Sequence, residues 1–195
     1  ISPLVPLVKT TNEKGMSATS VIIEDLAPFK NRVLYDALSS NAAIAYNTIN
    51  NNYHDIVIDC KYNNIKFGAV IYNPKSNIDI KINNNEVNII LDIAIESKII
   101  ELNNRINLTD SKVQNRIKKE ISKSIYNNIY ELIYYSKKNN VDVLGLGNII
   151  YKNYYDEYYK FKNKNIYDIA KFDVKVNNKM YRFGNINKGA WFYEW

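Results

Sequence analysis

The feature that most constrains the fold is an amphipathic stretch at residues 109–139, which contains neither glycine nor proline. Apolar residues recur every four positions along it, and that spacing places them on one face of an α-helix. At about 1.5 Å per residue the helix is more than roughly 40 Å long, so the stripe needs a sheet or other helices to cover it. The stripe itself indicates core packing rather than chemistry. Its residues are Val113, Ile117, Ile121, Ile125, Ile129 and Ile133, with Leu132 beside them.

The start of this helix carries two recognisable signals. Ser111 followed by Gln114 matches a capping box, in which the two side chains satisfy backbone donors of the first turn. Asp110 lies beside them, where a negative charge suits the positive end of the helix dipole.

Composition allows one large globular domain in this chain of 195 residues, of which 46% are hydrophobic. The net charge of +6 fits three kinds of partner: nucleic acid, an anionic membrane surface or an acidic polymer. The lysines are scattered, however, with no run of five basic residues. Such a diffuse excess is more typical of solubility than of a specific polyanion site.

The inventory of reactive side chains is small. Cys60 and His54 are the single cysteine and the single histidine, so an intrachain disulfide is impossible and a zinc site would need unusual carboxylate ligands. Cys60 falls in an apolar strand pattern and is predicted to be buried, whereas His54 precedes that strand. Phosphate-binding, serine-hydrolase and zinc-protease motifs are absent from the sequence. We therefore expect a protein that is not an enzyme, with no catalytic residues, cofactor or metal.

The remaining pattern predicts an α+β fold, with an antiparallel or mixed β-sheet packed against the long helix and several shorter helices. Residues 1–15 are expected to form a linker or edge segment, and residues 185–195 a tail. No apolar run approaches the ~20 residues of a membrane span. Strands are predicted at residues 17–24, 32–35, 56–62, 65–72, 78–82, 87–101, 172–176 and 179–183, the last two joined by a turn at Asn177–Asn178, and further helices at 36–49 and 141–152.

An aromatic segment follows the second predicted helix and is rich in lysine. Tyrosines spaced by three and four residues form helical faces, for which packing is the default interpretation. Tyrosines interleaved with Lys152, Lys160, Lys162 and Lys164 could also stack on bases, but no nucleic-acid module surrounds them and no nucleic acid is expected. A carboxylate pair for glycoside hydrolysis stays open as an alternative. The acidic residues in predicted strands are Asp59, Asp79, Asp92 and Glu96.

The sequence from Asp142 onward resembles the C-terminal signature of the Ger(x)C family, the lipoprotein C subunits of spore nutrient-germinant receptors. The matching parts are Asp142-Val143-Leu144-Gly145-Leu146-Gly147, a short aromatic and basic helix, and a closing strand that leads to Arg182-Phe183-Gly184. Upstream, a hairpin containing Phe29-Lys30, a long strand and a long lysine-rich helix stand in the expected order. The sequence departs from the family's pattern in two places. Tyr167-Asp168 stands where the family usually has a tryptophan before its closing strand, and the family's Gly-x-Ala-x-Phe pattern in the first hairpin is reduced to Leu26-Ala27-Pro28-Phe29.

The resemblance implies a single C-terminal α+β domain, residues 1–195, of a longer lipoprotein. An acylated cysteine upstream would tether that protein to the outer face of the spore inner membrane, beside two integral membrane subunits, A and B. The chain starts at Ile1 without Met or a signal peptide, and we expect further domains before it. A lipid chain and a basic protein surface would together attach such a protein to an anionic bilayer, the first by insertion and the second by electrostatic attraction.

The expected function is therefore protein–protein contact that supports germinant sensing. A basic module that binds a polyanion or a membrane surface, without a receptor role, is the alternative. The glycines are expected to shape the entry into the helix, and the exposed tyrosines and lysines to anchor a partner. The predicted interface comprises Gly145, Gly147, Tyr151, Tyr154, Tyr155, Tyr158, Tyr159 and Lys160.

Overall fold

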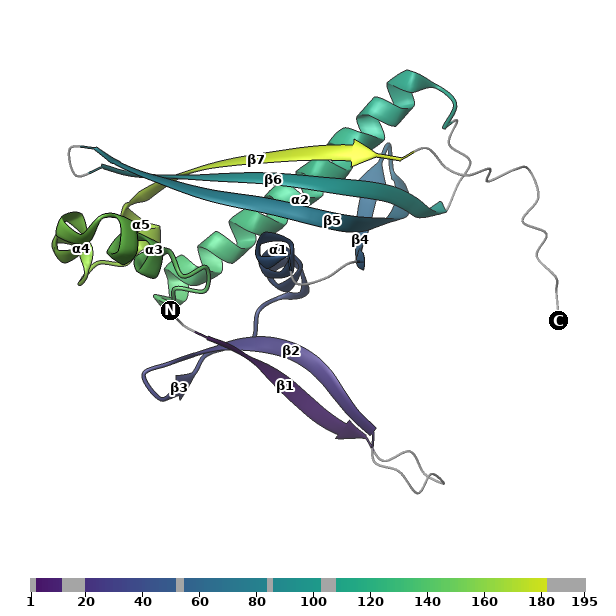
Figure 1. Ribbon diagram of the computed structural model, residues 1–195. Coiled ribbons are helices and arrows are strands. Elements are labelled where there is room, and N and C mark those ends of the chain that lie inside the picture. The colour runs from purple at the N-terminus through teal and green to yellow at the C-terminus, as the bar shows by residue number, and fades with distance from the viewer. Residues whose placement is uncertain (1–2, 12–19, 52–54, 84–85, 103–107, 182–195) are drawn as a thin grey trace.

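A four-stranded sheet and one long helix form the main body (Figure 1). The computed structural model describes residues 3–11, 20–51, 55–83, 86–102 and 108–181. The strand order is β4-β5-β6-β7; β4, β5 and β6 pair antiparallel, whereas β7 runs parallel to β6. The predicted α+β fold is confirmed. The strands are Asp55–Tyr62 (β4), Ile65–Asn83 (β5), Glu86–Leu102 (β6) and Ala170–Met180 (β7), and the long helix is Ser111–Asn139 (α2).

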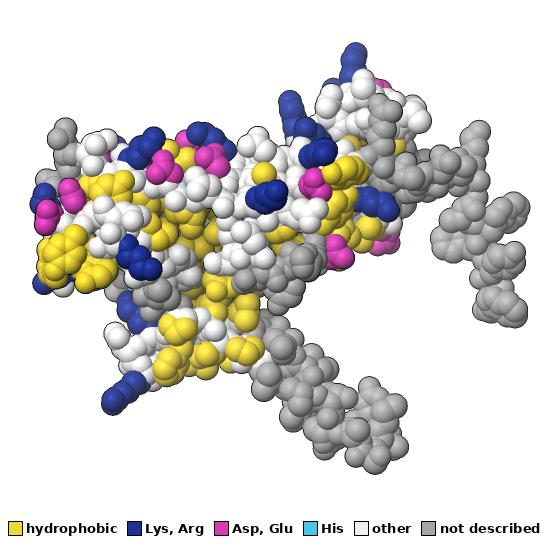
Figure 2. All heavy atoms as spheres, viewed as in Figure 1, with side chains coloured by type: hydrophobic (Ala, Val, Ile, Leu, Met, Phe, Trp, Pro, Cys, Tyr) yellow, Lys and Arg dark blue, Asp and Glu magenta, His cyan; other side chains and the backbone are white. Residues whose placement is uncertain are grey.

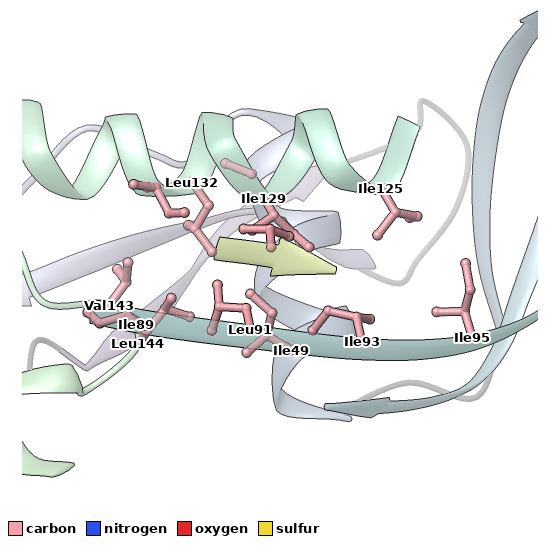
Figure 3. Close-up of a cluster of buried hydrophobic side chains, with 14 of the residues drawn as sticks. Ile49, Ile89, Leu91, Ile93, Ile95, Ile125, Ile129, Leu132, Val143 and Leu144 are labelled. Atoms are coloured by element: carbon pink, nitrogen blue, oxygen red, sulfur yellow. The ribbon is translucent and has the colours of Figure 1, made fainter. Parts of the chain in front are cut away.

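The isoleucine stripe of α2 lies against one face of this sheet, as predicted. Its central residues have no exposed surface, and alternate residues of β6 point at them from the sheet (Figure 3). Side chains on one face of the helix repeat about every 3.6 residues, and they pack against strand side chains that repeat every two residues. Each such side chain contributes about 1.5–3 kcal/mol when it leaves water. The facing residues are Ile117, Ile121, Ile125, Ile129 and Leu132 on the helix, and Ile89, Leu91, Ile93 and Ile95 on the strand.

The start of α2 differs from the predicted capping box. Asp110 is the N-cap, because its side chain accepts a hydrogen bond from the backbone N–H of Lys112 at 2.8 Å. Ser111 is the first helical residue, and the Gln114 amide donates to the carbonyl of Leu108 instead of reaching back to the cap. The carboxylate is the stronger acceptor, and it displaces the predicted serine cap by one residue.

A second, smaller sheet contains Leu4–Thr11 (β1), Ser20–Lys30 (β2) and Val33–Leu34 (β3) in the order β1-β2-β3. β1 is an edge strand, in line with the predicted edge segment at residues 1–15, of which residues 12–15 lie outside the described part of the chain. β2 extends beyond the predicted strand at residues 17–24 and continues through Pro28 to Lys30. Backbone hydrogen bonds continue on both sides of the proline. The carbonyl of Pro28 accepts a hydrogen bond from the N–H of Tyr35, and the N–H of Phe29 donates one to the carbonyl of Pro3.

The helix α1, Ser40–Asn50, lies between the small sheet and the main body (Figure 1). It begins four residues later than predicted, with Ser39 as N-cap accepting from the N–H of Ala42 at 3.1 Å. Ser39 and Asn41 also donate to the carboxylate of Glu131 on α2. The buried face of α1 includes Ala42, Ala45 and Ile49, and Leu38 just before the helix is buried as well.

Two strand predictions are wrong for related reasons. Residues 65–72 and 78–82 belong to one continuous strand, β5, whose register shifts between Tyr72 and Lys75 around Asn73, a residue with φ of 48°. The closing hairpin at Asn177–Asn178 does not form, because β7 continues straight through both residues beside β6. Asn178 is only 6% exposed, and its carbonyl oxygen accepts from the Ser97 hydroxyl at 2.8 Å. Asparagines that mark turns elsewhere in this chain here sit inside strands.

Three short helices connect α2 to β7: Leu146–Asn153 (α3), Tyr155–Phe161 (α4) and Ile166–Ile169 (α5). α3 begins five residues later than the predicted helix at 141–152, because residues 141–145 form the turn that leads into it. α4 agrees with the helical spacing of the tyrosines, and α5 has no counterpart among the predictions. Among the described residues, no helix is both long enough and apolar enough to cross a membrane. Cys60 is buried as predicted, and this burial raises the pKa of its thiol to about 11, while His54 lies outside the described residues.

The central packing is tested by replacing Ile125 with alanine. Because the side chain is fully buried between α2 and β6, Ile125→Ala should lower the free energy of unfolding by about 2–5 kcal/mol in urea denaturation. Asn127→Ala, at an exposed position two residues further on, should change it by less than about 0.5 kcal/mol. Equal effects of the two substitutions would contradict the proposed helix orientation.

Candidate interaction surface on α3 and α4

Asp142 determines how the chain enters α3. Its Oδ1 accepts a hydrogen bond from the N–H of Leu146 at 2.9 Å, and its Oδ2 accepts one from the N–H of Gly147, also at 2.9 Å. The residue at the formal N-cap position is Gly145, which has no side chain to offer. The carboxylate three residues upstream therefore takes over the capping of the helix N-terminus.

Both glycines of the motif have a geometric reason to be glycine. Gly145 has φ of 70°, in the left-handed region that other residues enter only at a cost. At Gly147 a Cβ would lie 3.2 Å from Oδ2 of Asp142, so the bare backbone lets the carboxylate come close. The structure thus places both residues in the entry to α3, and their part in a partner interface stays a prediction.

Tyr167 completes the turn from α5. It is 3% exposed, its hydroxyl donates to Oδ1 of Asp142 at 3.0 Å, and it accepts from the N–H of Leu144 at 3.1 Å. Burial raises the pKa of Tyr167 well above its usual value, so the hydroxyl keeps the proton that it donates. Its ring stacks on Phe172 of β7 at 5.8 Å. This tyrosine, which stands where the resembled family has tryptophan, ties the motif to the sheet, and sequence spacing alone gave no signal for the contact.

The turn fixes which faces of α3 and α4 are buried. Apolar residues of the short helices enter the core, namely Leu146, Ile150, Phe161 and Ile166. Tyr154 is half-buried, and its hydroxyl donates to the carbonyl of Ile80 on β5 at 2.5 Å. Tyr154 therefore has a structural contact that the interface prediction did not anticipate.

The other tyrosines form a continuous patch on the outside. Tyr151, Tyr155 and Tyr159 are 45%, 53% and 49% exposed, and Tyr158 is half-buried among them. The rings touch in sequence, with centroid distances of 5.1–5.7 Å, and the hydroxyls of Tyr155 and Tyr159 are 3.0 Å apart. Lys160 is exposed beside them. We call Tyr151, Tyr155, Tyr158 and Tyr159 the tyrosine patch.

The tyrosine patch is a surface feature rather than part of the core. Figure 2 shows hydrophobic side chains gathered over α4, with Lys or Arg side chains bordering them. Tyrosine buries a large apolar ring while keeping a hydroxyl in water, and this combination is enriched at protein interfaces. The arrangement is suited to binding another macromolecule by contact.

Two of the four carboxylates considered for hydrolysis, Asp79 and Glu96, have ordinary partners. Asp79 pairs with Lys81, and Glu96 accepts from Tyr181 at 2.7 Å and from Asn73 at 2.9 Å. These hydrogen bonds, that from Tyr181 first, hold the pKa of Glu96 below its usual value. Within the described residues, no cluster of three or more His, Cys, Asp or Glu residues is arranged to hold a metal ion.

Comparison with known proteins gives two findings. The sequence model of the family described as "Spore germination B3/GerAC like, C-terminal" matches residues 24–184, which include Asp142 and the whole tyrosine patch. The crystal structure of the GerBC protein is similar in fold, with a TM-score of 0.71 over 93% of this chain at 14% sequence identity. This chain spans 57% of the length of that one. No curated protein matches the sequence.

The turn that positions α3 is tested by removing its acceptor. Asp142→Ala should lower the free energy of unfolding by about 2–4 kcal/mol, because the cap is lost and the buried Tyr167 hydroxyl loses its acceptor. Asp156→Ala, at an exposed position in the first turn of α4, should cost less than about 1 kcal/mol.

A double-mutant cycle separates the contact from the cap. Asp142→Ala combined with Tyr167→Phe should destabilise less than the sum of the single changes, with a coupling of at least about 0.5 kcal/mol in urea denaturation. Strict additivity would show that the two side chains do not support each other.

Proposed function

Because this chain belongs to the Ger(x)C family of spore germination proteins, we propose that it is the C-terminal domain of the C subunit of a nutrient-germinant receptor. The match of the family's C-terminal sequence model over residues 24–184 is the observation that carries the proposal. The domain acts without catalysis, through contact with other receptor subunits. It supports germinant sensing by helping to hold the receptor together.

The tyrosine patch is the contact surface in this proposal. Three exposed tyrosines within one group of touching rings supply the large, rigid side chains that dominate binding energy at interfaces. Their mutual contacts limit the rotamers that must be ordered on binding, which lowers the entropic cost. Lys160 adds charge at the rim, where it steers association more than it adds affinity.

The cellular setting in this proposal is the one that the family resemblance implies. The domain is the last part of a longer lipoprotein, whose acylated cysteine anchors it to the outer face of the spore inner membrane. The integral membrane A and B subunits are its partners. The net charge of +6 adds attraction to anionic headgroups, and this attraction complements a single lipid chain that alone binds only reversibly.

One observation favours the alternative of a polyanion-binding or membrane-binding module. A cavity of about 1130 Å³ is lined by residues of β5, β6, β7 and α2 that include Lys75, Lys118, Lys119 and Lys179. Figure 2 shows Lys and Arg side chains over the end of the molecule where α2 begins. Such a module would bind anionic vesicles with an affinity that falls steeply with salt and would need no receptor subunit.

The receptor proposal is tested by co-purification of the full-length protein with tagged A subunit from spore membranes. Tyr155→Ser combined with Tyr159→Ser should lower recovery at least tenfold, because two exposed anchors are lost. Tyr134→Ser, at a 65% exposed tyrosine on α2, is the matched control and should leave recovery unchanged.

Two results would count against this assignment. Equal recovery of all three proteins would remove the tyrosine patch from the interface. A wild-type protein that is not recovered with the A subunit, yet binds phosphatidylglycerol vesicles in a salt-dependent manner, would favour the alternative module.

A further inference from the structure

A cavity of about 590 Å³ opens directly beside the tyrosine patch. Two residues of the patch, Tyr151 and Tyr158, form part of its wall, so the cavity and the patch are one continuous surface. Three separate segments meet there: the end of the β2–β3 hairpin, the turn after α2, and the stretch from α3 to α5. The polar groups around it include Lys30, Lys162, Lys164, Asn140, Asn148 and Asn165.

The three lysines bring more positive charge to the cavity than its one lining carboxylate, that of Asp142, can balance. The ammonium of Lys162 lies 5.0 Å from the ring centre of Tyr159, and that of Lys164 lies 5.9 Å from the ring centre of Phe161. These cation–π contacts hold both groups near the aromatic wall. The ammonium of Lys30 donates to the carbonyl of Asn140. Across the part of the chain that the structure describes, none of the three forms an ion pair.

The carboxylate that lines the cavity belongs to Asp142, and it is already engaged. Its two oxygens accept from the N–H groups of Leu146 and Gly147 and from the hydroxyl of Tyr167. Its charge is therefore committed to the helix N-terminus and the buried tyrosine. Among the lining residues, Lys162 and Lys164 carry ammonium groups, and Asn140 and Asn148 carry amide side chains that can donate to a ligand.

We infer that this cavity receives carboxylate side chains of an acidic segment of the partner protein that docks on the tyrosine patch. The inference rests on the proposed function and names the chemistry of the partner at that same site. Ammonium and amide donors satisfy carboxylates, while the tyrosine wall takes up the apolar atoms beside them. The volume matches that of a binding site, and its continuity with the exposed patch favours a segment that spans both over a separate small molecule.

The charge pattern would also make the cavity select an acidic partner over a basic one. A basic cavity at the edge of an aromatic patch attracts an acidic partner and repels a basic one, which fixes the orientation of docking. The patch supplies contact area, and the cavity selects among partners.

The test uses the 195-residue chain and two synthetic peptides as probes. The acidic peptide is acetyl-Glu-Glu-Phe-Glu-Glu-amide, and its control has glutamine at each glutamate position. In NMR titrations the acidic peptide should cause saturable shifts of the amide signals of Lys162, Lys164 and Tyr151. The glutamine peptide should bind at least tenfold more weakly, because the charge-assisted hydrogen bonds are absent.

A pair of matched variants locates the binding site. Lys162→Gln with Lys164→Gln should weaken binding of the acidic peptide at least tenfold. Lys112→Gln with Lys123→Gln removes the same charge from two exposed positions of α2 outside the cavity and should change binding less than twofold. All four positions are exposed, so circular dichroism should show unchanged thermal unfolding.

Three outcomes would overturn the inference: equal binding of both peptides, equal weakening by both pairs of variants, or binding of phosphatidylglycerol vesicles through Lys162 and Lys164 without binding of the acidic peptide. The last outcome would assign the cavity to a lipid surface. Each of them leaves the co-purification result with the A subunit unaffected, so failure of the acidic-segment inference is distinguishable from failure of the receptor proposal.

Discussion

Burial of the α2 stripe against β6 is the interaction on which the rest of the structure depends. A helix of 29 residues carries a continuous apolar face, and a strand of 17 residues presents alternating apolar residues to it. Neither element is stable alone, because a single long helix and a half-buried strand each expose their apolar surface to water. Once they pack, the direction of α2 determines where its C-terminus lies, and the candidate interaction surface is assembled there.

The C-terminus of α2 is a junction of several segments because its last carbonyls need partners. Ser136 accepts from the N–H of Val141, and Lys137 accepts from Asn140 and from the Asn165 side chain. The side chain of Lys137 also pairs with Asp168 of α5 at 3.3 Å. These bonds hold the turn that leads to Asp142 and the segment that returns to β7. The tyrosine patch is thus positioned by the end of the helix that carries the core.

The sequence predicts the parts of this structure whose signal is local and long. The α2 stripe repeats over about six turns, the alternation in β6 persists over its whole length, and Asn63-Asn64 marks a hairpin with φ of 46° and 66°. The parallel pairing of β7 was not predictable, because nothing in a strand specifies its neighbour and Asn177-Asn178 resembles a turn. The bond between Asp142 and Tyr167 joins residues 25 positions apart. For the candidate site, the sequence identified the tyrosines, but which of them face outward depends on that bond and on the turn it supports.

Germination of spores is the most direct test of the receptor assignment. In a strain whose other Ger(x)C genes are also deleted, loss of this gene should abolish dipicolinate release in response to nutrients. Release triggered by a surfactant that bypasses the receptors should be unchanged, and a copy of the gene should restore the nutrient response. An undiminished nutrient response in that strain would contradict the account.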